Sequence, residues 1–124
     1  MTGPYEPVVQ YVNAVLDTKA LDVVVLDLHG LTSFADTFVI CSGRSHRQVS
    51  AIAELVEQNL KAGGIKPLGI EGIREGHWVL MDYGDVIIHI FYEPIRIFYD
   101  LEGLWSDARR EDIADHQSKI SEAE

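Results

Sequence analysis

Residues 78–91 have the sequence WVLMDYGDVIIHIF, in which two apolar runs flank the pair Gly84-Asp85. A two-residue loop with glycine first favours a type II′ turn, because glycine readily adopts the positive φ that this turn requires. The stretch therefore predicts a β-hairpin with one strand on each side of the pair.

The register that follows from this turn divides the hairpin into two faces. One face is wholly apolar and belongs in the core, with Tyr83 opposite Val86, Met81 opposite Ile88, and Val79 opposite Ile90. The other face mixes apolar groups with one acid and one imidazole, and consists of Trp78, Leu80, Asp82, Ile87, His89 and Phe91. Aromatic anchors beside polar groups are typical of protein interfaces, so this face is a candidate contact surface. Alternatively, helices cover this face too and Trp78 belongs to the core, as in many α/β proteins.

The segments before the hairpin predict two helices and two further strands. Val23–Leu26 and Phe38–Cys41 are continuous apolar runs, typical of strands covered on both faces. Residues from about Pro7 to Lys19 place apolar side chains on one helical stripe. A second helix begins with Ser45-His46-Arg47-Gln48, the spacing of a capping box, and ends at Gly63-Gly64.

The remaining segments complete a single α/β domain with a mixed β-sheet and flanking helices. Lys66–Ile70 predicts a short strand, which Pro67 places at an edge. Pro94 opens a final helix through Glu102 that ends near Gly103, with Leu104 and Trp105 packing behind it. The domain is expected to span residues 1–108, and residues 109–124 are expected to form an acidic, flexible tail.

The charge of the chain restricts its partners. Ten basic and twenty acidic residues give a formal net charge of −10, which opposes direct binding to nucleic acid or to an anionic membrane. A basic protein is the partner class that fits. Because no apolar stretch is long enough to span a bilayer and no basic and hydrophobic leader opens the sequence, a cytoplasmic location is expected.

Catalytic and metal-binding patterns are weak. Ser42-Gly43-Arg44-Ser45 joins a strand to a helix and could hold a phosphate group, but it lacks the P-loop pattern, and helix capping is the favoured explanation because it needs nothing beyond helix formation. Asp82 and Asp85 bracket a turn, and the histidines lack zinc-ligand spacing. The lone Cys41 is expected to be buried and inert. We therefore expect no catalytic residue, no metal and no cofactor; the alternative is a nucleotide- or phosphate-binding regulator or enzyme.

Five ordered blocks resemble the ribosomal silencing factor family, also called RsfS or Iojap-like, over about Asp17 to Ala108. The blocks are DTFVICSG (36–43), SHRQVSAIA (45–53), EG (71–72), WVLMDYGDVIIHIF (78–91) and RIFYDLEGLW (96–105). The resemblance implies a nucleotidyltransferase-like fold without the catalytic acids, and a protein that is not an enzyme. It further implies binding to the basic large-subunit ribosomal protein uL14, a block to joining of the small and large subunits under nutrient limitation, and homodimers when the protein is free.

The resemblance also indicates which residues contact the partner. Trp78 is expected to be the apolar anchor, and Glu71 and Asp82 the acidic partners of lysine or arginine. The mixed hairpin face adds Leu80 and His89 to the expected partner-binding set, and the resemblance adds Arg96, Tyr99 and Leu101. Alternatively, Arg96 and Tyr99 hold the final helix on the sheet. Thr37 and Ile97 depart from the residues common in the family, so contacts through these two side chains are not transferred.

Overall fold

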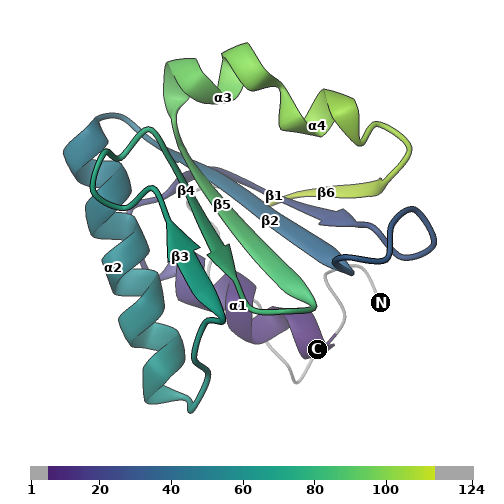
Figure 1. The fold of residues 1–124 in the computed structure, drawn as a ribbon, viewed down its shortest axis with the longest axis horizontal. Helices are drawn as coiled ribbons and strands as arrows, with labels where there is room; N and C mark the ends of the chain where they lie inside the picture. The colour runs from purple at the N-terminus through teal and green to yellow at the C-terminus, as the bar shows by residue number, and fades with distance from the viewer. Residues whose placement is uncertain (1–5, 114–124) are drawn as a thin grey trace.

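The chain folds around one mixed sheet of six strands, which the computed structural model describes over residues 6–113 (Figure 1). The strand order is β3-β4-β5-β2-β1-β6, and only the β2–β5 pair is parallel. The strands are β1 (Leu21–Asp27), β2 (Thr37–Gly43), β3 (Gly69–Glu71), β4 (Trp78–Asp82), β5 (Val86–Tyr92) and β6 (Arg109–Ile113). The helices are α1 (Glu6–Leu16), α2 (His46–Ala62), α3 (Glu93–Tyr99) and α4 (Leu101–Leu104). The predicted α/β class, with a mixed sheet and flanking helices, is confirmed.

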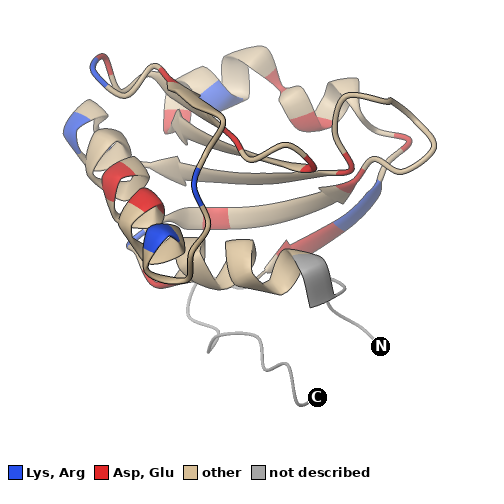
Figure 2. Cartoon of the chain, turned by 60° about the horizontal axis from the view of Figure 1, so that its bottom comes forward, with Lys and Arg blue, Asp and Glu red and all other residues tan. Residues whose placement is uncertain are grey.

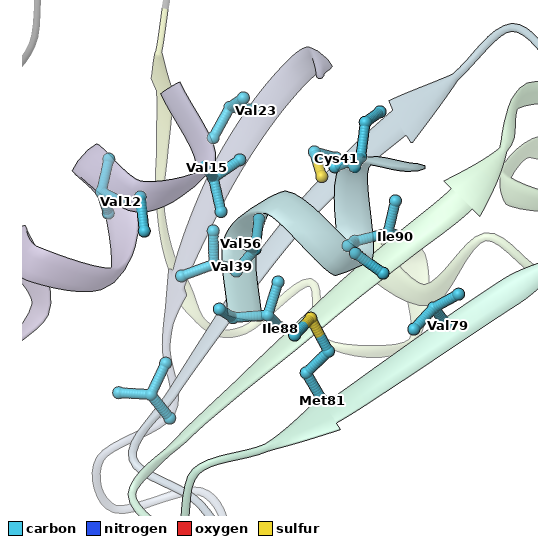
Figure 3. Close-up of a cluster of buried hydrophobic side chains, with 14 of the residues drawn as sticks. Val12, Val15, Val23, Val39, Cys41, Val56, Val79, Met81, Ile88 and Ile90 are labelled. Atoms are coloured by element: carbon cyan, nitrogen blue, oxygen red, sulfur yellow. The ribbon is translucent and has the colours of Figure 1, made fainter. Parts of the chain in front are cut away.

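The main core lies between the sheet and the α1–α2 pair, which covers one face (Figures 1 and 3). Val12 and Val15 of α1 and Val56 of α2 are buried against strand residues such as Val39 and Ile88. Burying each such side chain contributes about 1.5–3 kcal/mol, so this layer supplies much of the stability of the fold.

The hairpin and its register are confirmed. Gly84 has a φ of 89°, and the backbone N–H of Tyr83 donates to the carbonyl oxygen of Val86 over 2.9 Å. Met81 pairs with Ile88 and Val79 with Ile90, and all four of these side chains are buried in the main core.

The second helix also begins and ends where its sequence predicts. The Ser45 hydroxyl accepts a hydrogen bond from the backbone N–H of Gln48 over 3.0 Å, as in a capping box. Gly63 caps the other end, and Gly64 follows with a φ of +84°.

Three predicted features of the C-terminal half are wrong. The single final helix is broken into α3 and α4 at Asp100, which adopts a left-handed φ of 47° and accepts a hydrogen bond from the backbone N–H of Gly103. Leu104 is 76% exposed instead of packing behind the helix. Residues 109–113, assigned to the flexible tail, form β6, which pairs with β1; the rest of that tail lies outside the described residues.

Two smaller differences concern element ends. The edge strand β3 starts at Gly69, three residues later than predicted, because Pro67 lacks the N–H that a strand residue donates. The first helix ends at Leu16 rather than near Lys19, and the Thr18 hydroxyl there donates to the carbonyl oxygen of Val15.

Acidic residues outnumber basic residues on the α3–α4 layer, whereas the two kinds are balanced on α2. Figure 2 shows both acidic and basic positions on α2 and on the α3–α4 layer. Within residues 6–113, no helix is long and apolar enough to cross a membrane.

Candidate functional site

The face of the sheet opposite α1 and α2 is only partly covered. A second apolar cluster, to which Leu101 of α4 contributes, buries Ile87, His89 and Phe91 of β5. On the neighbouring strand β4, however, the residues of this face remain half-buried. The alternative that helices cover this face therefore holds in part, because the helices cover the central strands and leave β4 and β3 open; that the open part contacts a partner stays a prediction.

The open part gathers five of the predicted contact residues, which we call the tryptophan surface: Trp78, Leu80, Asp82, Glu71 and Tyr99. Leu80 of β4 lies directly opposite Glu71 of β3, so the two side chains share one face. The pairing of Asp82 with Gly69 continues this face toward the hairpin turn. The surface thus combines apolar groups with two carboxylates, as predicted.

Trp78 is fixed by contacts with three residues. Its indole N–H donates to Nδ1 of His89 over 3.1 Å. Its ring stacks on Phe91 with centroids 4.8 Å apart and an interplanar angle of 29°, and Tyr99 lies 5.1 Å away on the α3 side. A side chain held in this way loses little conformational freedom on binding, which favours an anchoring role.

His89 is buried beneath Trp78 and holds the indole through a hydrogen bond, so its own ring is not exposed to solvent. It is 3% exposed, and burial lowers its pKa to about 4, so the imidazole is neutral at pH 7. Because Nδ1 accepts from Trp78, the ring proton resides on Nε2, which has no hydrogen-bond partner in the described part of the chain. The prediction that His89 itself contacts a partner is therefore not supported by its position.

Arg96 holds α3 in place. Its guanidinium donates to Glu102 at 2.8 and 3.0 Å, to the Ser42 hydroxyl at 2.8 Å and to the carbonyl oxygen of Asp22 at 2.8 Å. This cluster lines a cavity of about 640 Å³ between α3 and strands β1 and β6. Leu101 is buried in the second cluster, so of the three residues predicted around the final helix only Tyr99 reaches the tryptophan surface.

The Asp82 carboxylate stabilises the hairpin turn and is also partly exposed to solvent. Its Oδ1 accepts from the backbone N–H of Gly84 over 2.8 Å, which stabilises the hairpin turn. The turn chemistry predicted for Asp82 is confirmed, and the same side chain stays half exposed on the tryptophan surface.

The turn at residues 42–45 uses its polar groups locally. Ser42 is buried and its hydroxyl accepts from Arg96, the Ser45 hydroxyl caps α2, and the backbone N–H of Arg44 donates to the Gln48 side chain. Helix capping therefore accounts for this segment. In the described ranges, no three His, Cys, Asp or Glu side chains come together as a metal site. Cys41 is buried, and burial raises its pKa to about 12, which keeps the thiol protonated and unreactive.

The two positions that depart from the family pattern differ in exposure. Thr37 is buried, and its hydroxyl has no hydrogen-bond partner within residues 6–113. Ile97 is 80% exposed on α3.

Sequence reasoning missed a group of exposed apolar side chains on the α3–α4 layer. Phe98 is 78% exposed, and Leu104 and Ile97 are exposed to a similar degree. The sequence Asp100-Leu101-Glu102-Gly103 could have indicated the helix break, because an aspartate that tolerates the left-handed region can cap a new helical turn. That break turns Leu104 outward.

Comparison with known proteins places these features in a family. The family model described as "Ribosomal silencing factor during starvation" matches residues 4–124. Two bacterial proteins named ribosomal silencing factor RsfS are similar over 97 residues each. The one from Halalkalibacterium halodurans is 45% identical, over 78% of this chain and 83% of its own length, and the one from Bacillus subtilis is 42% identical, over 78% and 82%.

A solved structure agrees with the fold. A crystal structure of a protein from Chromobacterium violaceum superposes with a TM-score of 0.75 at 35% identity, covering 92% of this chain and 89% of the other.

Proposed function

Because the chain belongs to the ribosomal silencing factor family, we propose that it binds the large ribosomal subunit through ribosomal protein uL14 and sterically blocks association of the small subunit. In this way it represses translation in the cytoplasm when nutrients are limiting. No reaction is required, because a bound protein that occupies the joining surface excludes the other subunit by its bulk.

The observation that carries this proposal is the tryptophan surface. A fixed, half-buried indole with carboxylates beside it suits a basic protein partner, since apolar anchors supply affinity and acidic groups select lysine and arginine. An interface of ordinary size buries about 800 Å² on each partner, and the tryptophan surface would form part of such an area.

Subunit joining in a sucrose gradient tests the proposal. Purified large and small subunits are mixed with and without the protein, and the fraction of joined ribosomes is measured. We expect the wild-type protein to comigrate with large subunits and to reduce joining. Unchanged joining at saturating protein would overturn the proposal.

Two variants locate the site. Trp78→Ala removes the anchor and should weaken binding to large subunits by about 2 kcal/mol, or roughly thirtyfold. Asp82→Lys reverses a charge and should also weaken binding. Circular dichroism checks that both variants fold, and retention of full affinity by both would exclude the tryptophan surface as the binding site.

Nucleotide titration by calorimetry provides a check against a nucleotide-binding regulator or enzyme. The engaged polar groups of the turn at residues 42–45 give no support to that alternative, so we expect no heat of binding. A clear, phosphate-dependent affinity would favour it.

A further inference from the structure

The α3–α4 layer exposes three large apolar side chains, which we call the helical patch: Ile97, Phe98 and Leu104. Their exposed fractions are 80%, 78% and 76%. Exposed apolar side chains that occur singly are ordinary, whereas contiguous exposed apolar groups mark interaction sites, and Phe98 is in ring contact with the exposed Tyr99. The helical patch therefore requires an explanation beyond chance exposure.

The fold does not use α3 to fill its own core. No residue of α3 is buried, and the helix is held mainly through the polar contacts of Arg96 with Glu102, Ser42 and Asp22. Ile95 packs, partly buried, on the second cluster, and the ring of Tyr99 contacts Trp78 at its edge. Polar anchoring leaves the apolar side chains of α3 free to contact another molecule.

The helical patch continues the tryptophan surface. The ring of Tyr99 lies 5.1 Å from Trp78, and the ring of Phe98 lies 5.1 Å from Tyr99. A molecule seated on Trp78 therefore meets Tyr99 next and Phe98 after it.

The charges around the patch select among occupants. Three carboxylates on or beside the two helices, those of Glu93, Asp100 and Asp107, form no ion pair among residues 6–113. The nearby Arg96 is paired with Glu102, and Arg110 of β6, which is bonded to Asp112, also lies near Asp100. A second copy of this chain seated on this patch would place like acidic groups against each other and add a second net charge of −10, which is unfavourable at this contact; a homodimer formed through another surface is unaffected. A basic segment is favoured instead.

We propose that the helical patch extends the tryptophan surface and docks a protein segment of the large ribosomal subunit in which aliphatic or aromatic side chains are flanked by lysine or arginine. This inference rests on the proposed function and specifies the chemistry of a second contact with the same particle. The apolar side chains of the segment cover Ile97, Phe98 and Leu104, and its basic groups face the three carboxylates.

Matched serine variants test the inference by affinity for purified large subunits. Phe98→Ser and Ile97→Ser each remove one exposed apolar group, so folding should persist, and each should weaken binding about tenfold or more. Leu55→Ser is the control, since Leu55 is an apolar residue that is 45% exposed on α2, which covers the opposite face of the sheet. The control should bind as the wild type does.

The possible outcomes separate this inference from the proposed function. If Phe98→Ser and Ile97→Ser bind normally while Trp78→Ala binds weakly, the helical patch is not a contact and the proposed function stands. If Leu55→Ser loses as much affinity as Phe98→Ser, the effect is unspecific and the inference is also wrong. If the wild type does not bind large subunits at all, both proposals fail.

Light scattering on the free protein tests the rival occupant. If the wild type is a dimer that Phe98→Ser converts to a monomer with unchanged affinity for large subunits, the patch joins two copies of the chain and the inference is overturned. An unchanged oligomeric state together with weakened binding supports it.

Discussion

Among single residues, the Trp78–His89 pair shows how a buried group prepares an exposed one. The indole N–H is used inside the protein, so a partner that seats on Trp78 meets the apolar part of the ring and need not supply an acceptor. His89 in turn keeps a neutral, fixed tautomer, although its Nε2–H has no partner within the described residues. A buried donor without a partner costs about 1–3 kcal/mol, a cost the fold tolerates where Trp78 is positioned.

The buried imidazole predicts acid sensitivity. The histidine of the unfolded chain gains a proton below about pH 6.5, whereas native His89 stays neutral down to about pH 4. The unfolded state therefore binds more protons in this window, and the free energy of unfolding falls by about 3 kcal/mol as the pH drops from 6.5 to 4. Urea unfolding of the wild type and of His89→Phe at several pH values should show this fall in the wild type only, after subtraction of the carboxylate effects that both share.

His29→Gln provides the control with the opposite sign. The hydrogen bond to Asp27 raises the pKa of His29 in the folded protein. Protonated His29 therefore stabilises the fold at pH values below the pKa that this histidine has in the unfolded chain. This stabilisation is lost as the pH rises through the higher pKa of the folded protein. A His89→Phe variant that keeps the full acid sensitivity would show that another group causes it.

Hydrogen exchange should distinguish the two indoles. The Trp78 N–H is bonded to His89, whereas the Trp105 N–H has no hydrogen bond among residues 6–113. In a ¹⁵N-edited spectrum we expect the Trp78 indole proton to exchange more slowly than that of Trp105, and the difference to shrink in His89→Phe. Equal exchange rates in the wild type would contradict the hydrogen bond.

At the level of elements, the Arg96–Glu102 pair connects α3 to α4 and to the sheet. The side chains of both residues are mostly buried, at 11% and 13% exposed. Removing one partner leaves an uncompensated charge in a poorly hydrated place, so Arg96→Met should cost about 2 kcal/mol of unfolding free energy, less than for a fully buried pair. Glu102→Leu alone should cost a similar amount.

The double variant provides the decisive comparison for this pair. Replacing both charges by apolar groups leaves neither one unpaired, so Arg96→Met combined with Glu102→Leu should be more stable than the sum of the single losses implies. Denaturant unfolding of the four proteins measures this coupling. Strict additivity would indicate that the two side chains do not interact in solution.

The elements also show what local sequence can and cannot determine. The hairpin register and both ends of α2 were predictable, because the turn pair Gly84-Asp85 and the cap Ser45 act on neighbouring residues. Strand β6 was not predictable, since it is polar and its partner β1 lies far away in the sequence. The partial covering of the Trp78 face depends on where α3 and α4 pack, which no periodicity within the hairpin encodes.

For the whole molecule, net charge and apolar contacts should affect different steps of binding. For the proposed basic partner, the charge of −10 would act over a distance of about one Debye length and attract the partner before contact, whereas Trp78 and Phe98 would act only after contact. Long-range attraction therefore sets the association rate, and the apolar side chains set the dissociation rate.

Binding kinetics with immobilised large subunits can separate these two contributions. We expect the association rate of the wild type to fall by about tenfold as the salt concentration rises from about 0.05 M to about 0.5 M, because the Debye length shortens severalfold. Glu71→Lys should lower the association rate at low salt and flatten its salt dependence, since it removes attraction at the tryptophan surface. Phe98→Ser should speed dissociation and leave the salt dependence of association unchanged. A salt-independent association rate would mean that the partner surface is not basic, and the acidic character of this chain would then need another cause.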